Sequence, residues 1–125
     1  MAKLLVVDDS PTELHLMKSV LSRHGYQVLE ASSGDQGVAM SVEYLPDLVL
    51  MDIVMPGLNG FQATRQISRN KKTAHIPVVI VTTKNQETDR VWGERQGARG
   101  YLVKPIQEEE LLGTIEGLLA EAVLS

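Results

Sequence analysis

The chain contains no cysteine, which excludes disulfide bonds and thiolate metal sites. It also has no long apolar run: the longest, such as those at residues 4–7 and 78–81, have about four residues and are far too short to cross a membrane. Asp8 and Asp9 end the first run too early for the core of a signal peptide. We therefore expect a cytoplasmic protein that does not insert into membranes.

The chain also has no excess of positive charge: 16 acidic and 12 basic side chains give it a net charge of -4. This balance disfavours non-specific binding to nucleic acid or to an anionic membrane. We interpret one local group of basic residues as a solvated helix face rather than a nucleic-acid site: Arg65, Arg69, Lys71 and Lys72. Neither a P-loop nor a dinucleotide-binding glycine pattern is present. The histidines lack metal-ligand spacing, and we expect them to be structural or surface residues: His15, His24 and His75.

What the sequence does contain is a regular alternation of short apolar runs and helical patterns. The runs at residues 4–7, 48–51 and 78–81 are rich in Val, Ile and Leu, which is typical of strands buried on both faces of a parallel sheet. Residues 28–29 and 101–103 are weaker candidates for two further strands.

Helix starts lie between these runs. Ser10 has the features of an N-cap, with Pro11 at the first helical position and Glu13 three residues after the cap. The pairs Ser33 with Gln36 and Asn59 with Gln62 repeat the spacing of a capping box. Residues 107–110 place three carboxylates in the first turn of a last helix, where the helix dipole favours them. Its predicted inner stripe is Leu111, Ile115, Leu118 and Ala122.

Together these patterns predict five strands alternating with five helices. Right-handed crossovers then produce an open parallel sheet with helices on both sides, an α/β three-layer sandwich. Residues 1–125 contain no repeat, low-complexity stretch or linker. We expect a single domain without a separate output domain.

Reactive side chains follow the predicted strands at one edge of this sheet. In open α/β sheets ligands bind beyond the carboxyl ends of the strands. Those ends carry, in chain order, Asp8 with Asp9, Asp52, Thr82 with Thr83, and Lys104 with Pro105.

Three neighbouring carboxylates repel one another, and a divalent cation removes that repulsion. Oxygen ligands favour a hard ion such as Mg²⁺. A carboxylate in such a site can attack phosphorus to form an aspartyl phosphate, while Lys104 would help neutralise the transferred charge. Singly, these residues have ordinary explanations: Asp8 would be a turn former, Thr82 a strand residue and Lys104 a solvated charge. Their combination favours the reactive interpretation.

The order of the motifs resembles the receiver domains of bacterial response regulators over essentially the whole chain. The matching stretches are residues 7–10 (VDDS), 50–57 (LMDIVMPG), 59–60 (NG), 81–83 (VTT), 97–98 (GA) and 101–105 (YLVKP). The resemblance implies a flavodoxin-like (βα)5 fold with strand order 2-1-3-4-5.

The resemblance also implies roles for individual residues. Asp52 would be the phosphoacceptor, and Asp9 and Asp52 would bind Mg²⁺ directly, together with the backbone carbonyl of Val54. Asp8 would complete the acidic pocket, through water. Lys104 would contact the phosphoryl group, and its bond to Pro105 is expected to be cis.

Two further residues would form the switch. Thr82 would move its hydroxyl toward the phosphoryl oxygen, and Tyr101 would turn inward behind it. The output surface would then be the face formed by the fourth helix, the fifth strand and the fifth helix.

Within the family the chain is similar to stand-alone chemotaxis-type regulators, and residues 55–66 and 91–98 resemble those of twitching-motility (type IV pilus) systems. This similarity implies a chemotaxis-type histidine kinase as phosphodonor, a downstream motility protein, and a monomer that acts only on its own phosphorylation state.

Two other classes of function fit the same fold. One is a receiver-like interaction module that works without phosphorylation; the intact set of Asp8, Asp9, Asp52, Thr82 and Lys104 argues against it. The other is a metal-dependent phosphatase or hydrolase, which the lack of any additional substrate-binding segment disfavours. A small phosphodonor with Mg²⁺ separates the three: the switch gains one phosphoryl group, the module gains none, and a hydrolase turns over repeatedly.

Overall fold

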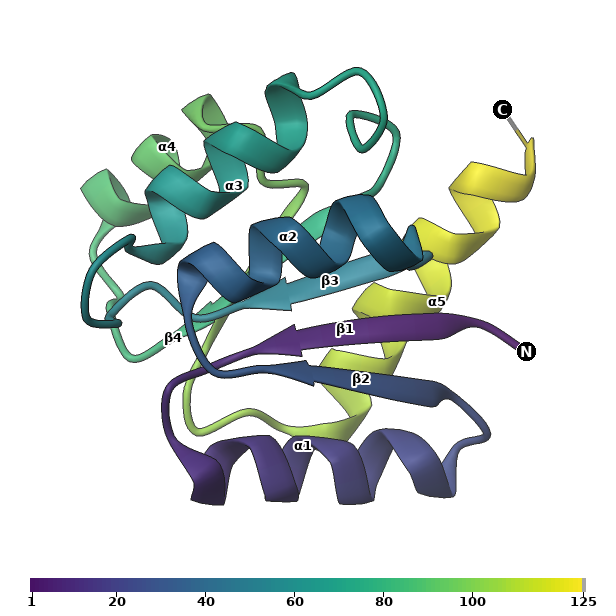
Figure 1. Cartoon of the computed structure of the whole chain (residues 1–125). Coiled ribbons are helices and arrows are strands. Elements are labelled where there is room, and N and C mark those ends of the chain that lie inside the picture. Colours follow the sequence, from purple (N-terminus) through teal and green to yellow (C-terminus); the bar gives the residue numbers. More distant parts are fainter. Residues whose placement is uncertain (125) are drawn as a thin grey trace.

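The computed structural model describes residues 1–124, which form a five-stranded parallel sheet between two layers of helices (Figure 1). The strand order is β2-β1-β3-β4-β5, which confirms the predicted topology. The strands are β1 (Lys3–Val7), β2 (Gln27–Ala31), β3 (Leu48–Met51), β4 (Val78–Thr82) and β5 (Gly100–Val103). The two weak candidates, β2 and β5, are longer than the sequence pattern indicated.

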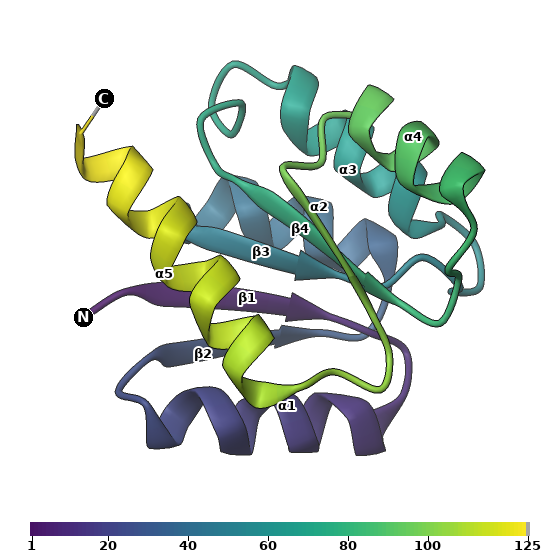
Figure 2. The same ribbon diagram turned by 180° about the vertical axis from the view of Figure 1, so that it is seen from behind.

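A helix follows each strand. The helices are α1 (Pro11–Arg23), α2 (Gly34–Tyr44), α3 (Gly60–Arg69), α4 (Glu87–Arg95) and α5 (Glu108–Leu124). Helices α1 and α5 cover one face of the sheet, and α2, α3 and α4 lie on the other, as the two opposite views show (Figures 1 and 2). Among the described residues, no helix is both long and apolar enough to cross a membrane.

Alternate residues of the central strands supply two separate cores. Leu4 and Val6 point to the face of α1 and α5, where they join Leu21 and Ile115. Leu5 and Val7 point to the opposite face. Because β1 is buried on both faces, its sequence is a continuous apolar run rather than an alternating one.

The helix caps agree with the sequence in part. Asn59 and Gln62 form the full reciprocal capping box. Ser33 caps α2 by accepting from Gln36 N–H, but the Gln36 side chain accepts from the backbone of Ser32 instead of returning to the cap. The capping-box spacing therefore identifies the N-cap correctly, but the reciprocal bond to the N-cap backbone does not form.

The last helix also differs slightly from the expectation. Helix α5 begins at Glu108 rather than at residue 107. Leu111 and Ile115 are buried and Leu118 packs against the core, as predicted, but Ala122 is exposed. The apolar stripe therefore ends before the helix does, since the final turn extends beyond the edge of the sheet (Figure 1).

Candidate phosphorylation site

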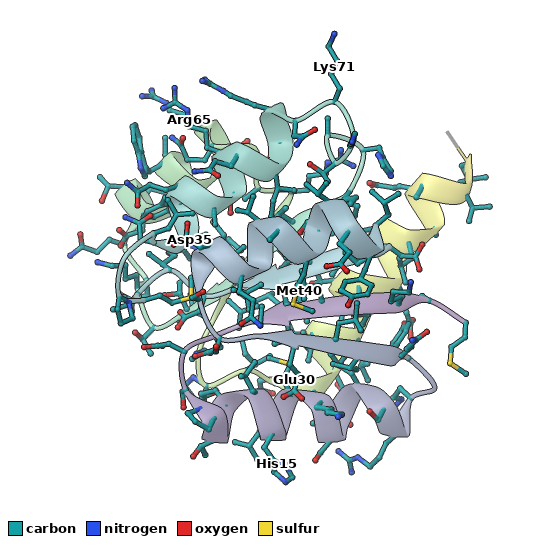
Figure 3. The ribbon with its side chains drawn as sticks, in the orientation of Figure 1. His15, Glu30, Asp35, Met40, Arg65 and Lys71 are labelled. Carbon is teal, nitrogen blue, oxygen red and sulfur yellow. The ribbon has the colours of Figure 1, made fainter. Side chains whose placement is uncertain are left out.

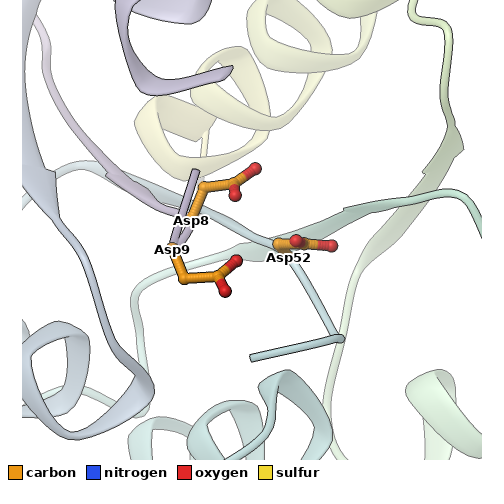
Figure 4. Close-up of side chains that lie close together, drawn as sticks. All are labelled: Asp8, Asp9 and Asp52. Atoms are coloured by element: carbon orange, nitrogen blue, oxygen red, sulfur yellow. The ribbon is translucent and has the colours of Figure 1, made fainter. Parts of the chain in front are cut away.

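The carboxylates of Asp8, Asp9 and Asp52 meet at the carboxyl edge of the sheet. Strands β1 and β3 pair in parallel with Val7 opposite Met51, so the residues that follow them emerge side by side. The Asp52 N–H donates to the carbonyl of Val7 at 3.0 Å and continues this ladder. One oxygen from each carboxylate lies within 4.8 Å of the others, and all three side chains extend toward the same side (Figure 4).

Backbone N–H groups orient two of the three carboxylates. Asp8 Oδ1 accepts from Ser10 N–H at 2.9 Å, and Asp52 Oδ1 accepts from Ile53 N–H at 2.8 Å. Asp8 and Asp52 are only 5% and 9% exposed, whereas Asp9 is exposed. Together they form an acidic pocket in which two carboxylates are buried and oriented and the third is exposed.

Lys104 is the cation of this pocket. Its Nζ donates to Asp8 Oδ2 at 2.9 Å and lies 3.8 Å from Asp52 Oδ2. Burial alone would lower the pKa of Lys104, but the hydrogen bond with Asp8 and the charges of Asp52, Asp8 and Glu13 outweigh it, so its pKa is raised. Lys104 is thus held as an ammonium ion. The Lys104–Pro105 peptide bond is cis, as expected.

The pocket carries more negative than positive charge. Burial, opposed by Lys104 and reinforced by Asp8 and Asp9, raises the pKa of Asp52. Three carboxylates near one ammonium leave an excess of negative charge that a divalent cation would neutralise, and their hard oxygen donors fit Mg²⁺. The residues present therefore suit the ion that the resemblance implies.

Of the predicted switch pair, Thr82 is the last residue of β4, at the same edge of the sheet as Asp52, whereas Tyr101 lies near the start of β5 and pairs with Ile80. Thr82 is fully buried, and its Oγ1 accepts from Lys84 N–H at 3.3 Å. The Tyr101 hydroxyl donates to the Lys84 carbonyl at 2.8 Å, and the guanidinium of Arg90 lies 5.1 Å from the centre of its ring. The Val54 side chain is 57% exposed and points away from the core.

One charged neighbour was missed by the sequence analysis. Glu13, in the first turn of α1, places Oε2 3.8 Å from Lys104 Nζ. Its position was deducible: α1 begins directly after Asp8 and Asp9, so its first turn lies at the same edge as the three aspartates. The capping pattern by itself indicates only that Glu13 belongs to the first turn of the helix.

Residues 4–116 match the response regulator receiver domain family. The chain belongs to that family. It is 62% identical over 120 residues to protein PilH of Pseudomonas aeruginosa, covering 96% of this chain and 99% of PilH. It is 36% identical to the DNA-binding regulator RpaA of Synechocystis, where the match covers 95% of this chain and 49% of RpaA. The resemblance found in the sequence is thereby confirmed, with PilH as a close relative over its full length.

Solved receiver structures share the fold. The chemotaxis protein CheY4 of Vibrio cholerae superposes with a TM-score of 0.89 at 30% identity, over 94% of this chain and 98% of that one. The receiver domain of a Pseudomonas aeruginosa sensor histidine kinase gives 0.89 at 28% identity, over 95% and 98%. That structure has a magnesium ion coordinated in its active site cleft. Receiver domains bind Mg²⁺ at an acidic pocket and interact with histidine kinases, and this chain has the corresponding acidic triad.

Proposed function

We propose that this chain is a stand-alone response regulator that accepts a phosphoryl group on Asp52 from a chemotaxis-type histidine kinase. The observation that carries the proposal is the convergence of Asp52 with two further carboxylates and the Lys104 ammonium at one end of the sheet. Asp52 directly follows the central strand β3, and Lys104 Nζ lies 3.8 Å from its Oδ2. Its Oδ1 is held by a backbone N–H, which makes Oδ2 the oxygen assigned to react.

The transfer itself requires little of the protein beyond position and charge. Asp52 Oδ2 attacks the phosphorus of the kinase phosphohistidine, an O–P bond forms, and the N–P bond breaks. The electron pair of the broken bond returns to the imidazole nitrogen of the kinase, which then takes up a proton. The Lys104 ammonium, 3.8 Å from Asp52 Oδ2, would neutralise an oxygen of the phosphoryl group. To do so it would give up part of its hydrogen bonding with Asp8.

The acidic pocket would also hold Mg²⁺. Asp9 and Asp52 would be direct ligands with the backbone carbonyl of Val54, and Asp8 would bind through water. When bound, the ion supplies charge neutralisation between Asp52 and the incoming phosphoryl group. The exposure of Asp9 supports this assignment, because a ligand at the mouth of the pocket leaves the ion open to a phosphodonor.

Thr82 and Tyr101 would transmit the modification to the surface of α4, β5 and α5. The similarity to PilH over its whole length supports a role in type IV pilus twitching motility, with a motility protein as downstream partner. Such a role places the protein in the cytoplasm beside its kinase. It acts as a monomeric switch that turns over no external substrate.

Phosphorylation with acetyl phosphate tests the proposal. With Mg²⁺, intact-mass spectrometry should show one added phosphoryl group on the wild type and none on Asp52→Asn. A matched variant, Asp47→Asn, removes an aspartate at the far end of β3 and should be labelled normally. Equal labelling of wild type and Asp52→Asn would reject Asp52 as the acceptor, and release of many phosphates per chain would indicate a hydrolase.

A further inference from the structure

A strongly basic corner lies outside the phosphorylation site, on α3, the α3–β4 loop, the end of α4 and the α4–β5 loop. Residues 53–86 contain no aspartate or glutamate at all, although the chain as a whole is acidic. The corner is formed by six exposed cationic side chains: Arg65, Arg69, Lys71, Lys72, Arg95 and Arg99. Figure 3 shows Arg65 and Lys71 extending away from the body of the molecule.

The tertiary structure joins these residues into one surface. Arg65 and Arg69 are four residues apart on α3 and so lie one turn apart, about 6 Å along the helix. The turn after α4 packs tightly on α3, since a Cβ on Gly97 would clash with Ser68. Arg99 then donates to the carbonyl of Ala74 at 3.3 Å, which ties the loop after α4 to the loop after α3.

The six cations have no acidic partner of their own. Within residues 1–124, none of the six forms an ion pair, whereas Lys18, Arg23 and Lys104 all do. Glu94, the acidic side chain of the last turn of α4, lines a pocket with Arg90 and Tyr101. Of the six cations only Arg99 also lines that pocket, and in the described part of the chain it forms no ion pair there but donates to a backbone carbonyl. A surface with this much unpaired charge repels itself, and an anionic partner would relieve that repulsion.

The size and setting of the corner indicate what kind of anion fits. Outside it the chain has six basic and 16 acidic side chains, so the rest of the chain is strongly negative. A membrane or a long nucleic acid would extend beyond the corner and meet this negative surface. A short acidic segment would stay within the corner. Its repulsion by more distant acidic side chains would be weak, because charges separated by more than about 8 Å interact weakly at physiological ionic strength.

We infer that this basic corner is a docking surface for a short acidic peptide segment of a partner protein. It is separate from the phosphorylation site: α3 begins at Gly60, beside Asp52, and runs away from it, so that the end of α3 and the loop that follows lie toward the opposite end of the strands (Figure 1). Planar guanidinium groups suit the recognition of carboxylates, and four of the six cations are arginines. The inference does not depend on phosphorylation of Asp52.

Fluorescence anisotropy with a labelled decaglutamate peptide tests the inference. Wild type should bind the peptide, and Arg65→Gln/Arg69→Gln should weaken binding by about fivefold or more. The control Lys18→Gln/Arg23→Gln, on α1, has the same net charge and should stay within about twofold of wild type. Circular dichroism verifies that both variants are folded. The Asp52→Asn variant should bind as well as wild type.

Four outcomes would overturn the inference. These are the absence of peptide binding by wild type, an equal loss in the two double variants, altered binding by Asp52→Asn, and tighter binding of a single-stranded oligonucleotide or of phosphatidylglycerol vesicles than of the peptide. The second outcome would mean that only net charge matters. The last would assign the corner to a nucleic acid or a membrane.

Discussion

Thr82 and Tyr101 bind opposite sides of the same backbone segment, the main chain of Lys84. Thr82 Oγ1 accepts from Lys84 N–H at 3.3 Å, and the Tyr101 hydroxyl donates to the Lys84 carbonyl at 2.8 Å. A Thr82 hydroxyl that turned toward a phosphoryl group on Asp52 would release the N–H, leaving the β4–α4 loop held on one side only. The loop therefore provides a physical link between the two predicted switch residues.

This link can be followed through Trp92, the only tryptophan, which lies on α4 and is 48% exposed. Beryllofluoride with Mg²⁺, a mimic of the phosphoryl group, should change Trp92 emission in wild type. Thr82→Ala removes the hydroxyl and should abolish most of the change, whereas Thr82→Ser keeps the hydroxyl and should preserve it. An emission change of equal size in Thr82→Ala would deny Thr82 a coupling role.

Asp9→Asn is expected to separate metal binding from stability. The change removes a proposed Mg²⁺ ligand and also relieves repulsion with Asp8 and Asp52. Magnesium affinity measured by calorimetry should fall by about tenfold or more, while the thermal midpoint without Mg²⁺ should stay the same or rise. The exposed Asp35, changed to Asn, serves as the control. Unchanged affinity in Asp9→Asn would contradict the ligand assignment.

Gly60 is a structural requirement of the site, because a Cβ there would clash with the backbone carbonyl of Asp52. Gly60→Ala should lower the free energy of unfolding by about 1–3 kcal/mol and slow labelling by acetyl phosphate. Gly113→Ala is the matched control. Gly113 lies on the exposed side of α5 with open space around it, and the change should stabilise the protein by up to about 1 kcal/mol. Urea denaturation measures both. Equal stability of Gly60→Ala and wild type would show that the backbone shifts at little cost to make room for the added methyl group.

The sequence was most informative where one physical effect dominates. Strands β3 and β4 are buried on both faces, so their apolar runs located them to within one residue. Edge strand β2 is only partly buried, and its pattern revealed two of its five residues. The carboxyl-edge rule brought Asp8, Asp9 and Asp52 together correctly.

Contacts that depend on the path of a loop were not accessible in this way. Nothing in the sequence indicates that Tyr101 donates to Lys84 or that Gln36 accepts from Ser32, because each contact is set by backbone angles outside the regular elements. The exposure of Ala122 depends on how far α5 extends past the sheet, which its apolar spacing does not specify.

Tyr26 should make stability fall at alkaline pH. Burial, and secondly the charge of Glu116, raise the pKa of the Tyr26 phenol. Because the folded-state pKa exceeds the ordinary value of about 10, the contribution of Tyr26 is complete below that pH and is lost as pH rises through the folded-state pKa. Glu116→Gln should lower the Tyr26 pKa only in part, since burial remains. Tyrosinate absorbance in a Tyr44→Phe/Tyr101→Phe background measures it, and an unchanged pKa would exclude the Glu116 effect.

Val54 is expected to prolong the phosphorylated state. Hydrolysis of an aspartyl phosphate needs a water aligned opposite the bond that breaks. Val54 lies two residues after Asp52 and is 57% exposed, and its side chain offers no hydrogen bond to hold that water. An asparagine there could orient it, and Val54→Asn should therefore release phosphate several-fold faster than wild type. Val54→Thr, which keeps the β-branched shape and replaces one methyl group with a hydroxyl, should show a smaller increase.

The exposed Lys84 adds a positive charge nearby, so Lys84→Gln is measured in parallel to separate the effect of charge from that of water alignment. Phosphate release after removal of the phosphodonor gives the rates, and a Val54→Asn rate equal to or below that of wild type would reject the explanation.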